Sequence, residues 1–235
     1  MNSYKPVTHV IFDLDGTLLD TERVSIALNE SILQKFGKEL DLWDRAHLMG
    51  RPARSAADFV IRRYDLPISV DKYLEIAKNE FFEQTRQELL KCKLKPGAER
   101  LVKHLYNNKI PLAIATSSKK ETYALKTENH QELMSAFHHS VMSPDDAEVK
   151  RGKPAPDVFL VCASRFDDKP SPEEVLVFED APSGVEAAVA AGMQVVMVPD
   201  PQVDAEHRKM ATLVLGSLEH FKPELFNLPP FGDDF

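Results

Sequence analysis

The chain begins with a short apolar run that ends at a pair of acidic residues. Residues 7–12 are Val-Thr-His-Val-Ile-Phe, rich in β-branched and aromatic side chains, and the sequence continues as Asp-Leu-Asp-Gly. An apolar run bounded by turn-forming residues is typical of a buried strand that ends in a turn. We therefore predict a strand over residues 7–12 and a polar turn directly after it.

Between residues 22 and 92 the apolar positions repeat at helical spacing instead. Leu28, Ile32 and Phe36 recur every four residues. A second apolar stripe comprises Val70, Tyr73, Leu74, Ala77 and Phe81. Both periods predict amphipathic helices, and turn-forming glycine and proline residues divide the block into separate helices. We expect no strand in this block.

Beyond residue 97, helical stretches alternate with short apolar runs. The runs predicted to be strands are 111–115, 140–142, 175–178, 194–198 and 213–215, and the helices between them include 98–107, 156–165 and 185–191. Strands spaced by helices imply right-handed crossovers and a parallel sheet with both faces covered. The first strand must join this sheet, because a lone strand cannot satisfy its backbone hydrogen bonds.

These patterns together predict an α/β fold with two domains. The first is a doubly wound, Rossmann-like parallel sheet built from residues 1–19 and 93–235. The second is an α-helical cap domain, residues 20–92, inserted directly after the first strand.

Composition and charge narrow the classes of function. The 235 residues are 43% hydrophobic and 28% charged, as in an ordinary soluble globular protein. A formal net charge of -8 argues against binding to a nucleic acid polymer or an anionic membrane surface. The first residues do not resemble a secretory leader, and no apolar stretch is long enough to span a bilayer. We expect a cytoplasmic monomer whose partner is a small molecule.

Polar side chains gather where the predicted strands end, which is where open α/β sheets bind ligands. They are Asp13, Asp15, Thr116, Ser117, Ser118, Glu179 and Asp180, with Lys153 in a loop before a helix. Converging carboxylates repel one another unless a cation neutralises them, and their hard oxygens suit Mg²⁺. Hydroxyl and N–H groups at a strand-to-helix turn suit phosphate oxygens, and a lysine adds positive charge. The set therefore predicts phosphate-ester hydrolysis, in which an aspartate forms an aspartyl-phosphate.

Four segments, in order along the chain, resemble the motifs of the haloacid dehalogenase superfamily. They are Asp-Leu-Asp-Gly-Thr at 13–17, Ile-Ala-Thr-Ser at 114–117, Gly-Lys-Pro at 152–154 and Glu-Asp-Ala-Pro-Ser-Gly at 179–184. Any one of these motifs alone is weak evidence, but four in order at predicted strand ends and loops form a specific signal. The helical block after the first motif is similar to the small α-helical cap of this superfamily.

The resemblance implies roles for the acidic residues. Asp13 would be the nucleophile and a Mg²⁺ ligand through its carboxylate. Asp15 would be the general acid and base, and would bind the metal through its backbone carbonyl. Asp180 would be a further metal ligand, with Glu179 in or just behind the metal shell. The implied cofactor is Mg²⁺ and the implied reaction is hydrolysis of a small phosphomonoester.

The resemblance also implies where the substrate binds. Thr116 and the backbone of Ser117 would hold the phosphate, and Lys153 would balance its charge. The whole chain further resembles the pseudouridine-5′-phosphatase group of eukaryotes, through segments such as 18–22, 177–182 and 191–200. The substrate that this resemblance implies is pseudouridine 5′-phosphate. The segment 50–54 departs from that group, and in this superfamily the cap usually faces the leaving group, so the identity of the substrate depends on the cap. The candidate specificity residues there are Glu22, Gly50, Arg51 and Arg54.

Other interpretations of these residues stay open. Within the same chemistry, the chain could be a glycerol- or sugar-phosphate phosphatase, or a phosphomutase similar to β-phosphoglucomutase. More distant alternatives are a phospho-aspartate signalling module and a phosphate-binding module without catalysis. Thr116 to Ser118 could cap the following helix as well as bind phosphate, because both roles use the same N–H groups. Gly184 is interpreted as a helix–sheet packing position, and Arg51 and Arg54 could be ordinary surface charges.

Overall fold

The computed structural model describes residues 4–48, 53–201 and 203–232, with only the backbone described at 22, 46, 47 and 82–84. The chain divides into two compact units. One comprises Met1–Asp20 and Lys93–Phe235, and the other comprises Thr21–Cys92.

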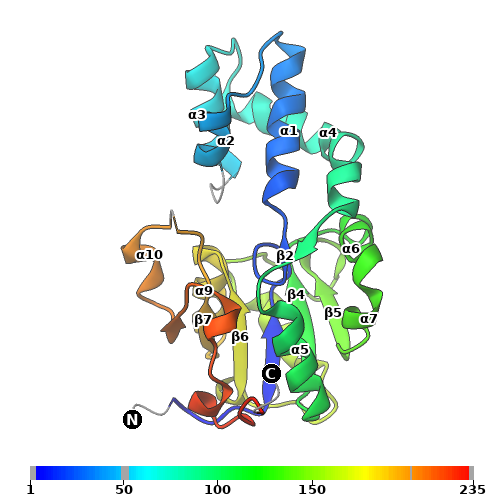
Figure 1. The fold of residues 1–235 in the computed structure, drawn as a ribbon, viewed down its shortest axis with the longest axis vertical. Coiled ribbons are helices and arrows are strands. Elements are labelled where there is room, and N and C mark those ends of the chain that lie inside the picture. The colour runs from blue at the N-terminus through cyan, green and yellow to red at the C-terminus, as the bar shows by residue number, and fades with distance from the viewer. Residues whose placement is uncertain (1–3, 49–52, 202, 233–235) are drawn as a thin grey trace. The chain divides into compact units, whose positions relative to one another are not determined.

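A six-stranded parallel sheet forms the centre of the first unit (Figure 1). Its order is β5-β4-β1-β6-β7-β8. The strands are β1 His9–Phe12, β4 Leu112–Thr116, β5 His139–Met142, β6 Val175–Glu179, β7 Gln194–Met197 and β8 Leu213–Val214. The opening strand pairs in parallel with β4 on one side and β6 on the other, as predicted. The carboxyl ends of β1, β4 and β6 therefore lie next to one another.

Helices and 3₁₀ turns cover both faces of this sheet. The helices are α5 Ala98–Asn107, α6 Lys120–Thr127, α7 Gln131–Met134, α8 Asp157–Ser164, α9 Pro182–Ala190 and α10 Ala205–Arg208. The 3₁₀ turns are η1 Glu128–His130, η2 Ser143–Asp145, η3 Pro172–Glu174, η4 Leu218–His220 and η5 Pro223–Phe226. One buried cluster joins α5 and the carboxy-terminal segment to the sheet, and another joins α8 and α9 to it. The predicted doubly wound α/β fold is confirmed.

A short antiparallel ribbon, absent from the predictions, closes the loop after β1. Its strands are β2 Leu19–Asp20 and β3 Lys93–Leu94. The two strands come immediately before and immediately after the helical unit in the sequence. Each is only two residues long, too short for the period-two alternation by which strands are recognised in sequence.

The second unit consists of helices in its described part, as the apolar spacing predicts. They are α1 Glu22–Lys35, α2 Leu42–Leu48, α3 Ala53–Tyr64 and α4 Val70–Leu90. Ser69 caps α4 by accepting the backbone N–H of Lys72 at 3.2 Å, which satisfies one of the first-turn donors. Inside this unit the hydroxyl of Tyr73 donates to Asn29 Oδ1 at 2.7 Å. No helix that the structure describes is both long and apolar enough to cross a membrane.

Candidate active site

The turn after β1 places Asp13 at the edge of the sheet. The backbone N–H of Asp13 donates to the carbonyl of Phe178 at 2.9 Å, which continues the pairing of β1 with β6. The next turn needs Gly16, whose φ of +81° lies in the left-handed region. A Cβ atom there would also lie 2.2 Å from Asp180 Oδ2. The turn can therefore approach Asp180 only with glycine at this position.

Lys153 links two of the predicted acidic residues. Its Nζ donates to Asp13 Oδ1 at 2.6 Å and to Glu179 Oε1 at 2.7 Å. A third hydrogen bond runs to the carbonyl of Ala115 in β4 at 3.2 Å. The lysine side chain is only 6% exposed, so these acceptors replace the water that its charge would otherwise need.

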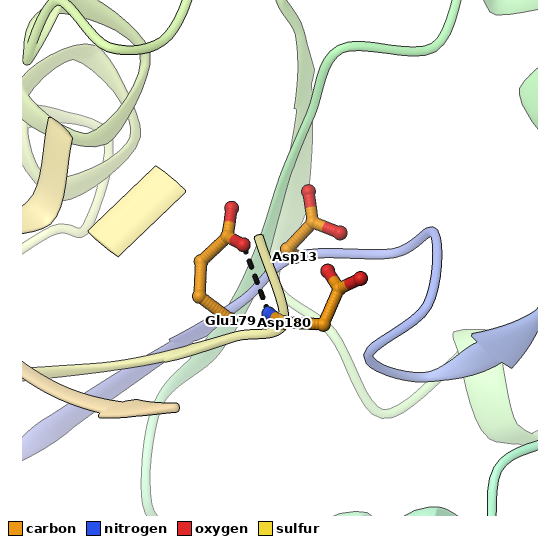
Figure 2. A group of neighbouring side chains, drawn as sticks. All are labelled: Asp13, Glu179 and Asp180. Carbon is orange, nitrogen blue, oxygen red and sulfur yellow. Dashed lines mark hydrogen bonds between the residues drawn. The ribbon is translucent and has the colours of Figure 1, made fainter. Parts of the chain in front are cut away.

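The structure brings together three of the four predicted metal ligands through their side chains (Figure 2). One carboxylate oxygen from each of Asp13, Glu179 and Asp180 lies within 4.8 Å of the other two. Thr17 Oγ1 donates to Asp180 Oδ1 at 3.3 Å, which orients that carboxylate from the turn. We call Asp13, Lys153, Glu179 and Asp180 the Asp13 cluster.

Glu179 already has protein partners on both of its oxygens. Oε1 accepts from Lys153, and Oε2 accepts the backbone N–H groups of Asp180 and Ala181, each at 2.9 Å. A Cβ atom at Gly184 would lie 1.7 Å from Glu179 Oε1, so the first turn of α9 leaves room for this carboxylate. Gly184, interpreted from sequence as a packing position, packs against this acid. Glu179 is placed to hold Lys153 and the turn, whereas Asp13 and Asp180 are better placed to be metal ligands.

The charges of the Asp13 cluster fit a divalent cation. When all four groups are ionised, three carboxylates and one ammonium leave two uncompensated negative charges, and only Asp180 among these residues is more than slightly exposed. Carboxylate oxygens are the ligands that Mg²⁺ prefers, and this ion is commonly held by one or two carboxylates while it keeps several waters. The donor set of Asp13 and Asp180 thus fits Mg²⁺.

The same imbalance changes the proton affinities of the Asp13 cluster. Burial, reinforced by repulsion from Glu179 and Asp15 and opposed by Lys153, raises the pKa of Asp13 to about 7. Burial and repulsion from Glu179 and Asp13 also raise the pKa of Asp180 well above its ordinary value. Burial alone would lower the pKa of Lys153, but Asp13 and Glu179 raise it instead. Strongly perturbed groups gathered in one place are typical of functional sites.

Asp15 belongs to a second group of contacts, which includes a lysine that sequence reasoning missed. Asp15 Oδ1 accepts from Lys126 Nζ at 2.5 Å, and Asp15 Oδ2 accepts from Ser118 Oγ at 2.7 Å. Lys126 Nζ also donates to Ser118 Oγ at 2.8 Å. Burial would raise the pKa of Asp15, but Lys126 and Ser118 hold it below its ordinary value. We call Asp15, Ser118 and Lys126 the Asp15 cluster.

The predicted phosphate-binding residues lie at the end of β4. Thr116 is fully buried, and its Oγ1 accepts the backbone N–H of Ser118 at 3.0 Å. Ser117, between them, is exposed. The side chain of Thr116 therefore shapes the turn, while Ser117 is accessible to a ligand. Their role toward phosphate stays a prediction.

The candidate specificity residues belong to the helical unit. Arg54 is exposed and forms an ion pair with Asp71 inside that unit. Glu22 begins α1, but its side chain lies outside the described residues, as do Gly50 and Arg51 entirely. Their predicted roles toward a substrate stay predictions.

The fold and the order of these residues agree with comparison to a known family. Residues 10–198 match the model of the haloacid dehalogenase-like hydrolases. The chain belongs to this family, which confirms the resemblance predicted from the four motifs. A solved HAD family hydrolase from Deinococcus radiodurans R1, with bound phosphate and sodium, has a TM-score of 0.74 and 26% identity. That match covers 96% of this chain and 99% of the solved one.

Two relatives are similar over nearly the whole chain. A Drosophila melanogaster protein named "Probable pseudouridine-5'-phosphatase" is 48% identical, over 97% of both chains. An Arabidopsis thaliana protein named "(DL)-glycerol-3-phosphatase 2" is also 48% identical, over 97% of this chain and 94% of its own. With the family match, they confirm the predicted class of enzyme, a phosphoric monoester hydrolase.

Proposed function

We propose that this protein is a Mg²⁺-dependent phosphatase that hydrolyses pseudouridine 5′-phosphate through an aspartyl-phosphate on Asp13. The observation that carries the proposal is the Asp13 cluster. There, a nucleophile candidate lies 2.6 Å from a buried lysine and shares a site with Asp180. The substrate rests on the likeness to the Drosophila melanogaster relative.

Phosphoryl transfer to Asp13 is the first step of the proposed mechanism. A carboxylate oxygen of Asp13 forms a bond to phosphorus as the ester P–O bond breaks, and Asp15 gives a proton to the leaving oxygen. Lys153 holds Asp13 and offers positive charge to the phosphoryl oxygens. Asp13 and Asp180 would hold Mg²⁺, with the backbone carbonyl of Asp15. When bound, the ion supplies Lewis-acid neutralisation of the phosphate charge.

Hydrolysis of the aspartyl-phosphate is the second step. Asp15 takes a proton from water as the water oxygen bonds to phosphorus, and the bond between phosphorus and Asp13 breaks. Inorganic phosphate leaves and Asp13 is regenerated. Asp15 suits the base role directly, because Lys126 and Ser118 keep its pKa low. For the acid role it must first gain a proton, which the negative charge of an entering phosphate favours by raising its proton affinity.

Glycerol phosphate is the second candidate substrate, because the Arabidopsis thaliana relative matches the chain at the same identity. A panel of pseudouridine 5′-phosphate, glycerol 3-phosphate and hexose phosphates, each with Mg²⁺, tests both. We expect inorganic phosphate, with the highest kcat/KM for pseudouridine 5′-phosphate. A preference for glycerol 3-phosphate would transfer the assignment to that substrate. An isomerised sugar phosphate without phosphate release would indicate a mutase.

A further inference from the structure

We propose that Lys126 is a positioning residue, which with Ser118 fixes the orientation of the Asp15 carboxylate toward the leaving group. The inference rests on the proposed function, in which Asp15 protonates that group. It assigns a task to a lysine that belongs to none of the four motifs.

The contacts of the Asp15 cluster form a closed ring. Lys126 Nζ donates to Asp15 Oδ1, Ser118 Oγ donates to Asp15 Oδ2, and Lys126 Nζ donates to Ser118 Oγ. Each carboxylate oxygen of Asp15 thus has its own hydrogen-bond donor, and the two donors, Lys126 and Ser118, are hydrogen-bonded to each other. A carboxyl group held at both oxygens has little freedom to rotate, whereas one donor alone would leave it a choice of orientations.

The burial of Lys126 indicates that this ring of hydrogen bonds has a functional role. The lysine lies in the last turn of α6, and its side chain is 6% exposed. Burying an ammonium group is costly unless it is paired, and lysines in soluble proteins usually keep the charged end in water. Lys119 and Lys120, at the start of the same helix, are exposed as that rule expects. The chain instead turns Lys126 inward to meet Asp15.

The turn after β4 connects this ring to the predicted phosphate-binding residues. The backbone N–H of Ser118 donates to Thr116 Oγ1 at 3.0 Å, so Ser118 is fixed from the end of the strand. Asp15, in turn, lies two residues after Asp13. The acid–base group and the nucleophile are therefore each held by their own lysine, Lys126 and Lys153. A general acid must meet its acceptor oxygen closely, and small misplacements cost large factors in rate.

The test is how kcat/KM of Lys126→Met depends on the leaving group. We use kcat/KM because it reports the steps up to and including phosphoryl transfer to Asp13. Methionine keeps the length of the side chain and removes its charge and donors. With glycerol 3-phosphate, a poor leaving group, we expect kcat/KM to fall about tenfold to a hundredfold. With para-nitrophenyl phosphate, whose leaving group needs no proton, we expect a much smaller fall. Lys120→Met, on the exposed part of the same helix, should leave both values unchanged.

A double-mutant cycle shows whether the effect passes through Asp15. In an Asp15→Ala background, we expect Lys126→Met to change kcat/KM hardly at all, because no carboxylate remains to be positioned. The same fall in both backgrounds, or an equal fall for both leaving groups, would overturn the inference. Either result would assign Lys126 to the fold alone. If Lys126→Met does not fold, Ser118→Ala replaces it, with the same split between leaving groups expected at smaller size.

Failure of this inference is distinguishable from failure of the proposed function. Asp13→Asn tests the function and does not involve Lys126. An inactive Asp13→Asn together with an unchanged leaving-group dependence in Lys126→Met would retain the phosphatase and overturn the positioning role. An active Asp13→Asn variant would exclude both the proposed phosphatase mechanism and the positioning role of Lys126.

Discussion

The Asp13 cluster and the Asp15 cluster each pair an aspartate with a buried lysine, yet the pKa values of the two aspartates are shifted in opposite directions. In the first, three carboxylates share one site with a single lysine that bonds to two of them, and burial raises the pKa of Asp13 to about 7. In the second, a lysine and a hydroxyl both donate hydrogen bonds to one carboxylate, and the pKa of Asp15 lies below its ordinary value. The balance of charge in each cluster decides the direction.

In the proposed mechanism, this difference in pKa matches two different tasks within one short motif. Acids whose surroundings push their pKa values apart can take different roles in one reaction. The excess of negative charge around Asp13 favours a cation there, and a bound cation would keep that carboxylate ionised for the proposed attack on phosphorus. The neutralised surroundings of Asp15 need no cation.

The largest effect should come from Asp13→Asn. The amide keeps the shape of the side chain but is a poor nucleophile, so we expect kcat to fall by about ten-thousandfold or more. Phosphate release from the preferred substrate measures it, and Asp167→Asn, an exposed acid, is the matched control. Activity near that of the unmodified protein would exclude Asp13 as the nucleophile.

Asp15→Ala should lower activity less than Asp13→Asn does, and the loss in kcat/KM should depend on the substrate. General acid catalysis contributes about a hundredfold to ten-thousandfold, and most where the leaving group is poor. We expect that loss in kcat/KM for glycerol 3-phosphate and a far smaller one for para-nitrophenyl phosphate. Equal losses for the two substrates would mean that Asp15 does not protonate the leaving group.

The two lysines should differ in their contributions to stability. Lys153→Met leaves the buried acids Asp13 and Glu179 and the half-buried Asp180 without their cation, so we expect the free energy of unfolding to fall by about 3–5 kcal/mol without metal. Lys126→Met should cost clearly less, because the Asp15 side chain is 31% exposed and keeps its bond to Ser118. Urea denaturation at neutral pH measures both. The reverse order would contradict the charge balance assigned to the two clusters.

The smallest expected effect is a pH dependence of the stability that Mg²⁺ binding gives to the folded protein. Asp13 has a folded pKa of about 7 against an ordinary 3.8, so the folded protein binds the extra proton between these values. Its contribution to stability is then present at low pH and is lost as the pH rises toward about 7. Asp15 acts oppositely: its contribution is lost as the pH falls below its ordinary value of 3.8.

If Asp13 holds Mg²⁺ as proposed, the ion competes with that proton. We therefore expect the rise in Tm on adding Mg²⁺ to grow between about pH 5 and pH 7.5. Thermal melts with and without Mg²⁺ across this range measure it, and Asp13→Asn should flatten the trend. A rise in Tm of constant size at every pH would show that no proton is displaced from the cluster.

The alternation of strands and helices was enough to predict the sheet and its charged edge. Asp13 and Asp180 directly follow strands, Lys153 lies in the loop before α8, and their motifs mark all three in the sequence. Lys126 carries no such mark, because its burial depends on how α6 packs rather than on its neighbours in sequence. The occupied oxygens of Glu179 were equally hidden, since they depend on backbone N–H groups of a turn.

In the proposed mechanism the phosphoryl group forms a covalent bond to Asp13, and trapping that bond shows whether it exists. Asp15→Ala should slow hydrolysis of the aspartyl-phosphate, so this variant can be mixed with para-nitrophenyl phosphate and Mg²⁺ and then quenched in acid. We predict that mass spectrometry finds one phosphoryl group on the peptide that contains Asp13, and none when Asp13 is also replaced by Asn. A phosphoryl group on another residue, or turnover with no phosphorylated protein at any time, would contradict the account.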